Sequence, residues 1–224
     1  MKLSKLCFSL LLVFLSLIPH SAFATLVTRL NGQAVYDTDI NLTWLANANL
    51  SATNTFGVSG IDPHGYMHWN TAQQWIAAMN KANYLGFNDW RLPNSSDACF
   101  EVYSGCEKNE MAHLRNSELS TPYFPFDVTN IGPFINVQAT YIPGSPFVPT
   151  YWTNISVSNN QEDAYFYYMS WDNQSQSGKN YYWSSAWAVR AGDVAAVPIP
   201  APVGLMVSGI VMLGLASKKR VSEN

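Results

Sequence analysis

An uncharged apolar run from Val197 to Ala216 constrains this chain more than any motif in its middle. At a rise of about 1.5 Å per residue, roughly 20 such residues form a helix that crosses the hydrocarbon core of a bilayer. The basic triplet that follows the run, Lys218-Lys219-Arg220, marks the side that stays in the cytoplasm. The sequence therefore predicts a C-terminal transmembrane helix, with everything before Val197 exported across the inner membrane.

The N-terminus agrees with export. Lys2 and Lys5 precede an apolar stretch, residues 6–18, that is too short for a comfortable span, and Ala22-Phe23-Ala24 supplies the small residues that signal peptidase reads. We therefore expect a signal peptide over residues 1–24 and a mature chain that begins at Thr25. The alternative is an uncleaved N-terminal anchor.

Residues 25–193 are then left for one folded domain, and about 170 residues are enough to bury a core. The whole chain has 12 Lys and Arg against 15 Asp and Glu. Five of the basic residues, and Glu223 among the acidic ones, belong to the terminal segments, which leaves 7 positive and 14 negative charges, a net of −7. Nucleic-acid binding depends on Lys and Arg at the phosphates, so we predict no nucleic-acid partner.

Aromatic residues make up 14% of the chain and charged residues only 12%. Tryptophan and tyrosine bury large apolar areas, so most of them are expected in the core or in packed loops. The alternative is that some of them form platforms on which sugar rings stack.

Two cysteines, Cys99 and Cys106, remain in the mature chain. An even pair at short spacing in an exported protein is most simply a disulfide. The alternative is a metal site, for which the neighbouring Glu110 and His113 would have to supply the further ligands.

Short strands are predicted over residues 26–45, where apolar and polar residues alternate around turn signals at Asn31-Gly32 and Asp37-Thr38-Asp39. A polar loop over residues 46–65 precedes the main helix, for which Asn70 and Gln73 form an N-terminal capping pair. The apolar face of this helix is formed by Ala72, Trp75, Ile76 and Met79, and Gly86 lies just past its end.

A second, shorter helix is expected from Glu110 to Arg115, with Asn109 as its cap. Six prolines over residues 121–149 favour an extended, ordered loop. Three strands are then expected, over Thr150–Ile155, Ala164–Trp171 and Tyr181–Arg190, with a turn in the Asn-, Gln- and Ser-rich stretch that ends at Gly178. The predicted class is α+β, with short antiparallel strands and one main helix.

A family resemblance is carried by Tyr36–Leu45, the helix with Trp75, Gly86–Pro93, Tyr151-Trp152-Thr153 and Tyr182–Arg190. These segments resemble the DUF1566 family, also called the Lcl C-terminal domain family, over most of residues 30–193. The resemblance implies a single irregular domain similar to the C-type-lectin-like or formylglycine-generating-enzyme-like folds. It also implies a bacterial surface protein, because some members are implicated in adhesion to glycans.

The most specific part of the resemblance is Asp89-Trp90-Arg91-Leu92-Pro93. In an extended segment Trp90 and Leu92 would share one face, with Arg91 on the other and able to pair with Asp89 or with Glu101. Proline fixes the direction of the chain, so we interpret this motif as structural rather than ligand-binding.

The tail resembles a PEP-CTERM sorting signal, in which Val197-Pro198-Ile199-Pro200 takes the place of the Pro-containing motif. The apolar run and Lys218-Lys219-Arg220 match its other two parts. The resemblance implies processing by an exosortase in a Gram-negative bacterium that makes exopolysaccharide. A plain single-pass anchor is the alternative, because the bilayer argument fits either.

Candidate metal ligands are few. Asp62, His64 and His68 have a loop spacing compatible with a metal, but they fall short of a typical ligand set. Trp171-Asp172-Asn173 is similar, with the order of the last two residues changed, to the Trp-Asn-Asp of sugar-binding C-type lectins, where carboxylate and amide oxygens could hold calcium. The alternative is a solvated turn.

The residues present no catalytic constellation, so we predict a protein that is not an enzyme and needs no cofactor, with calcium left open. The leading hypothesis is a surface-anchored module that binds or organises extracellular polysaccharide in adhesion or a biofilm matrix. The alternatives are a structural surface protein without a ligand and a cell-surface hydrolase or oxidase.

Overall fold

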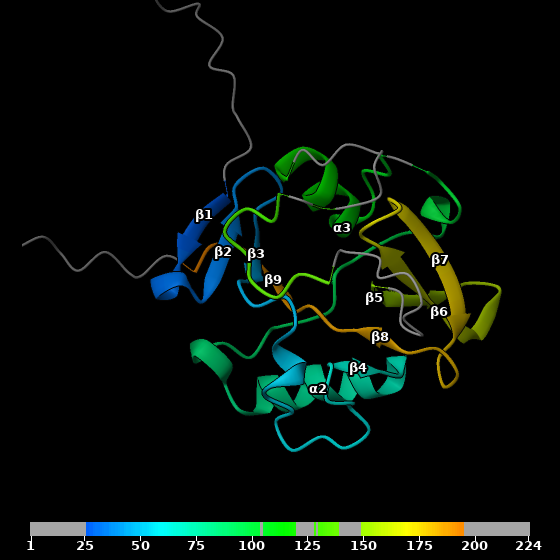
Figure 1. Ribbon diagram of the computed structural model, residues 1–224, viewed down its shortest axis with the longest axis horizontal. Coiled ribbons are helices and arrows are strands. Elements are labelled where there is room, and N and C mark those ends of the chain that lie inside the picture. Colours follow the sequence, from blue (N-terminus) through cyan, green and yellow to red (C-terminus); the bar gives the residue numbers. More distant parts are fainter. Residues whose placement is uncertain (1–25, 104, 120–127, 129, 139–148, 195–224) are drawn as a thin grey trace, which may run out of the picture.

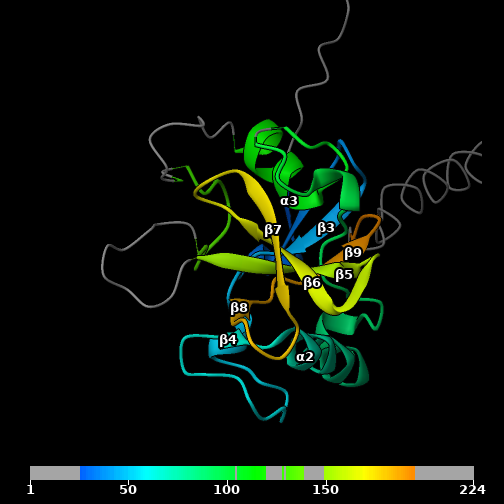
Figure 2. The same ribbon diagram turned by 90° about the vertical axis from the view of Figure 1, so that its right-hand side faces the viewer.

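The computed structural model describes residues 26–103, 105–119, 128, 130–138 and 149–194. Within them the chain forms two β-sheets, which lie on opposite sides of the view in Figure 1, with one helix below and a shorter helical segment above. Figure 2 shows the same arrangement after a 90° turn. The predicted mixture of a few helices with mainly antiparallel strands is confirmed at this level.

The first sheet has the order β1 (Leu26–Arg29), β2 (Ala34–Asp37), β3 (Leu42–Leu45) and β9 (Val189–Ala191), all antiparallel. The two expected turns join its first three strands. Asn31, Gly32 and Asn41 adopt positive φ angles of 55°, 88° and 52°, which glycine and asparagine tolerate best.

The second sheet has the order β4 (Tyr66–Met67), β8 (Ser184–Ser185), β5 (Thr150–Val157), β6 (Asn160–Tyr168) and β7 (Asn173–Gly178). Its strands pair antiparallel, except β5 with β8, which are parallel at Tyr151 and Ser185. Strands β5 and β6 lie where strands were expected; β5 begins at the predicted residue, and the other ends differ by two to four residues.

The polar stretch that ends at Gly178 is a strand and not the predicted turn. Its backbone pairs with β6 from Tyr168↔Asn173 to Asp163↔Gly178, and a backbone ladder does not require apolar side chains. Gln174, only 1% exposed, donates to the carbonyl oxygen of Ser96 and accepts a hydrogen bond from the Asn109 amide. These tertiary hydrogen bonds stabilise a strand that local composition does not indicate.

The single strand predicted over Tyr181–Arg190 is also wrong. The structure divides it into β8 and β9, which belong to different sheets. Between them Trp187 is fully buried, and its indole N–H donates to the carbonyl oxygen of Leu45 at 2.8 Å. The chain therefore crosses from one sheet to the other through a buried tryptophan.

Helix α2 (Trp69–Lys81) confirms the expected helix and its buried face of Ala72, Trp75, Ile76 and Met79. The predicted cap is wrong, because His68 occupies the N-cap position and no side chain caps the helix there. The helix begins earlier because the Trp69 N–H groups donate to the carbonyl oxygens of Lys179 and Thr153. Gly86 ends a separate 3-10 turn, Tyr84–Gly86, beyond the helix.

The second predicted helix is α3 (Glu110–His113), which continues as a π-helical turn over Leu114–Glu118. Asn109 caps it as expected, because its side-chain oxygen accepts from the N–H groups of Met111 and Ala112.

The core lies between the two sheets and α2 and is rich in tryptophan. Trp44, Trp75, Trp152 and Trp187 are fully buried, and Trp187 contacts Trp44 and Phe134 edge-on at 5.1 and 5.0 Å between ring centres. Such contacts stabilise the core beyond simple area burial.

The predictions for both ends of the chain concern residues outside the described part of the structure. They concern the signal peptide over 1–24, the sorting motif Val197-Pro198-Ile199-Pro200, the transmembrane helix and the basic Lys218-Lys219-Arg220. Among the helices that the structure does describe, none has the length and apolar character to cross a bilayer.

Candidate functional site

The family motif is built into the first sheet and the core. Trp90 is 2% exposed and Leu92 is fully buried, while the backbone of Arg91 pairs with Val189 at 2.8 and 2.9 Å. The Arg91 guanidinium makes two hydrogen bonds, of 2.7 and 2.8 Å, to the carboxylate of Glu110. The expected partners Asp89 and Glu101 are therefore wrong, because the helical segment α3 brings a more distant carboxylate to this arginine.

Asp89 pairs instead with Arg190, through two hydrogen bonds of 2.8 and 2.9 Å. The Arg190 guanidinium lowers the pKa of the Asp89 carboxyl below its usual range. The carbonyl oxygen of Pro93 accepts from the backbone N–H of Asn154. In this motif Trp90 and Leu92 therefore pack in the core, and Asp89 and Arg91 form ion pairs.

The predicted disulfide between Cys99 and Cys106 is present. The alternative metal site does not form, since Glu110 pairs with Arg91 and His113 faces another cluster. The loop that the disulfide closes carries Tyr103, whose side chain is 63% exposed.

Asp172 is the last residue of the β6–β7 turn, and its side chain lies inside the protein. It is 1% exposed and its carboxylate accepts from the Tyr167 hydroxyl and the Asn116 amide, and one of its oxygens lies 3.4 Å from the Arg115 guanidinium. The solvated turn considered for Trp171-Asp172-Asn173 is therefore wrong for Asp172. Asn173 is the first residue of β7 and is 6% exposed.

The three loop residues Asp62, His64 and His68 do not converge. One Asp62 oxygen accepts from the backbone N–H groups of His64 and Tyr66, which shapes the loop. A ring nitrogen of His68 lies 3.0 Å from the carbonyl oxygen of Tyr182.

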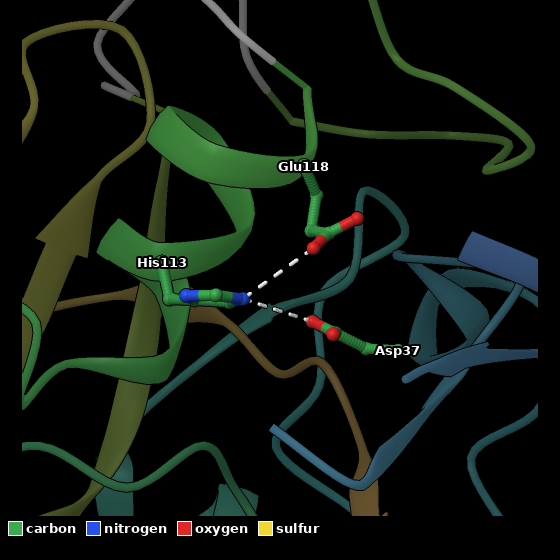
Figure 3. Close-up of side chains that lie close together, drawn as sticks. All are labelled: Asp37, His113 and Glu118. Atoms are coloured by element: carbon green, nitrogen blue, oxygen red, sulfur yellow. Dashed lines mark ion pairs between the residues drawn. The ribbon is translucent and has the colours of Figure 1, made fainter. Parts of the chain in front are cut away.

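A different group of titratable side chains does converge, at the top of the molecule. Asp37 from the end of β2 meets His113 from α3 and Glu118 from the π-helical turn, as Figure 3 shows. The Nε2 atom of His113 lies 3.4 Å from an Asp37 oxygen and 3.5 Å from a Glu118 oxygen. Sequence reasoning missed this cluster, because its members come from segments more than 70 positions apart and have no motif spacing.

Burial explains the electrostatics of this cluster. Removal from water, with the Asp37 carboxylate nearby, raises the pKa of Glu118 to about 6. The same Asp37 carboxylate raises the pKa of His113. Because both pKa values are raised, His113 and Glu118 hold their protons to a higher pH than the same side chains would in water.

A row of aromatic side chains lies on the second sheet and the loops beside it. Trp171 stacks on Tyr168 at 4.9 Å, Tyr168 meets the buried Phe166 edge-on at 5.2 Å, and Phe166 stacks on Tyr182 at 4.3 Å. Trp183 follows Tyr182 in the chain, and its ring packs against His68 at 4.5 Å between ring centres. The row is therefore built from strand β6, the β6–β7 turn and the β7–β8 loop.

Several rings of this row and of the β7–β8 loop beside it are exposed to solvent. Trp171 and Trp183 are each 37% exposed, Tyr181 is 88% exposed, and Tyr168 and Tyr182 are partly exposed. We call these five residues, Tyr168, Trp171, Tyr181, Tyr182 and Trp183, the aromatic surface. Clustered partly exposed aromatic rings are typical of binding surfaces, because they offer large contact area at low entropic cost.

Local geometry positions these rings. The φ angle of Asp172 is +49°, a left-handed conformation that aspartate tolerates, and it turns Trp171 outward while the carboxylate points inward. Gly178 accepts from the N–H groups of Tyr181 and Tyr182, and a Cβ atom there would lie 2.7 Å from the Tyr181 ring. The glycine therefore makes room for the tight turn that presents Tyr181.

The comparisons with known proteins agree with the resemblance carried by the motif. No match is found among curated proteins or among solved structures. The model of the Lcl C-terminal domain family matches residues 33–190, a range that includes the motif around Trp90, the Asp37 cluster and the aromatic surface. The chain therefore belongs to the Lcl C-terminal domain family.

Proposed function

We propose that this chain is an exported, surface-anchored and non-enzymatic protein that binds extracellular polysaccharide through the aromatic surface. The observation that carries this proposal is the row of contacting rings from Trp171 to Tyr182, with Trp171 and the neighbouring Trp183 both partly exposed. A sugar ring has an apolar face of C–H groups, and an aromatic ring offers a complementary negative face. Stacking on several rings in a row suits an extended chain of repeated sugars.

The charge of the domain narrows the class of polysaccharide. With 7 positive and 14 negative charges over residues 25–193, the domain repels a polyanion at long range. We therefore propose a neutral polysaccharide as the ligand class. Exposed hydrogen-bonding groups next to the aromatic rings, such as the amide of Asn180, would bind the hydroxyl groups of the sugar.

The proposed location follows from the ends of the chain. Signal peptidase would remove residues 1–24, and the tail over 197–220 would hold the protein in the inner membrane until an exosortase processes it. The domain over residues 25–193 would then reach the periplasm, the cell surface or the extracellular matrix of a Gram-negative bacterium. A fold similar to C-type lectins or to formylglycine-generating enzymes is part of the same proposal.

Binding is tested with the purified full chain on immobilised neutral polysaccharides, with acidic polysaccharides as a parallel series. The double variant Trp171→Ala/Trp183→Ala should bind at least tenfold more weakly. Tyr36→Ala, which removes a partly exposed ring on β2 of the first sheet, should bind like the unchanged chain. Equal binding by the double variant, or no binding to any neutral polysaccharide, would contradict the proposal.

Location is tested separately, by adding protease to intact spheroplasts. The proposal expects digestion of the domain and protection of the basic tail. A domain that resists protease until the cells are lysed would contradict export.

A further inference from the structure

We infer that Asp37, His113 and Glu118 bind one divalent transition-metal ion. Their three converging atoms lie within 4.8 Å of one another. A tetrahedral ion with bonds of about 2.0–2.2 Å to nitrogen and oxygen places its ligand atoms about 3.4 Å apart. The distances from His113 Nε2 to the two carboxylates, 3.4 and 3.5 Å, match that spacing.

The same distances are poor for direct hydrogen bonds. Asp37 Oδ2, His113 Nε2 and Glu118 Oε1 are buried atoms that make no hydrogen bond to any residue the structure describes. The side chains of Asp37 and Glu118 are 0% and 1% exposed. Two buried carboxylates face one imidazole, which even when protonated carries charge enough for only one of them, whereas an ion of charge +2 would neutralise both.

The carboxylate of Asp37 is already oriented for this role. Its other oxygen, Oδ1, accepts hydrogen bonds from the backbone N–H groups of Asp39 and Ile40, at 3.0 and 3.4 Å. These bonds aim Oδ2 at His113, as outer hydrogen bonds do for metal ligands. Asp39 Oδ2, 3.7 Å from His113 Nε2 and on a half-exposed side chain, lies at the rim, where it or water would take a fourth position.

The donor set favours a particular class of ion. One imidazole nitrogen with carboxylate oxygens suits Zn²⁺ and Mn²⁺, whereas Ca²⁺ and Mg²⁺ prefer oxygen ligands alone. The ion would also join the turn after β2 to the segment formed by α3 and the π-helical turn (Figure 3). This inference is independent of the aromatic surface and of polysaccharide binding.

The test uses the purified full chain after dialysis against a chelator, titrated with Zn²⁺, Mn²⁺ or Ca²⁺ in separate calorimetric experiments. One equivalent of Zn²⁺ should bind and raise the midpoint of thermal unfolding, and Ca²⁺ should do neither. Asp37→Asn and Glu118→Gln should each weaken Zn²⁺ binding at least tenfold, while His64→Gln, which alters an exposed histidine beside Asp62, should not.

A second measurement does not depend on variants that have to fold. Co²⁺ added to the unchanged chain should give the strong visible absorption of a tetrahedral nitrogen and oxygen site, and Zn²⁺ should abolish it. No Zn²⁺ binding, no Co²⁺ spectrum, or unaltered binding in the Asp37→Asn chain would overturn the inference. The cluster would then be held by a protonated His113 between the two carboxylates.

Discussion

Tryptophan occupies two different settings in this domain. In the core, Trp75, Trp152 and Trp187 are fully buried, and each indole N–H donates to a backbone carbonyl oxygen. On the aromatic surface, Trp171 stacks on Tyr168, Trp183 packs against His68, and each keeps 37% of its area exposed. The same residue type therefore stabilises the fold where both the ring and its N–H are satisfied inside the protein, and remains available for the proposed ligand where part of the ring is in contact with water.

The largest effect is expected from Trp187→Ala. This change removes the ring that packs against both Trp44 and Phe134, so the free energy of unfolding should fall by about 3–5 kcal/mol in urea. Trp183→Ala is the matched control and should cost less than about 1 kcal/mol. Equal losses in the two variants would break the distinction between the two settings.

The disulfide loop borders the aromatic surface, because the backbone of Tyr103 pairs with Asn173, and the Tyr103 ring is exposed. Replacing both Cys99 and Cys106 with serine should lower the free energy of unfolding by about 2–3 kcal/mol, because the closed loop is short. Polysaccharide binding at a temperature where the variant is folded should stay unchanged. A parallel loss of binding would show that the ligand also contacts this loop.

A single ring on the surface should matter less for stability than for binding. Trp171→Ala should weaken binding of a neutral polysaccharide by about three- to tenfold, which corresponds to about 0.7–1.4 kcal/mol. Trp171→Phe should restore most of the affinity, because it keeps a ring over Tyr168. Binding is measured by calorimetry, and a Phe variant as weak as the Ala variant would show that stacking is not the reason.

The smallest effect concerns the ion pair at the edge of the tryptophan core, where Arg190 holds Asp89 and covers the ring of Phe87 at 4.3 Å. Arg190 lowers the pKa of Asp89, so the pair stabilises the fold above the usual aspartate pKa, and the effect is lost as pH falls through the lowered value. Because Asp89 is half exposed, the expected contribution stays below about 1 kcal/mol.

This pH dependence is checked by comparing the unfolding free energy of the unchanged chain with that of Asp89→Asn. The two free energies should differ at about pH 7 and converge as the pH falls through the lowered pKa of Asp89. A difference that grows toward acid would contradict the sign of the shift.

Local patterns predicted several elements well. The period of Ala72, Trp75, Ile76 and Met79 identified the buried face of α2, and the capping residue Asn109 identified α3. The two cysteines identified the disulfide. These features depend on neighbours in sequence, so sequence alone was enough.

The features that sequence could not predict depend on distant contacts. The polar composition of strand β7 predicts a turn. The segment is a strand because β6 pairs with its backbone and the Asn109 side chain donates to Gln174. Arg91 pairs with Glu110, 19 positions away in the sequence, because tertiary packing brings α3 next to the motif. For the same reason no motif marks the meeting of Asp37 with His113 and Glu118.

The most direct test of polysaccharide binding is hydroxyl-radical footprinting of the full chain, with and without a neutral polysaccharide that it binds. Ligand is expected to protect Trp171, Tyr181 and Trp183 from oxidation and to leave Tyr36, on the first sheet, unprotected. Protection of Tyr36 alone, or no change at the three surface rings under saturating ligand, would contradict polysaccharide binding by the aromatic surface.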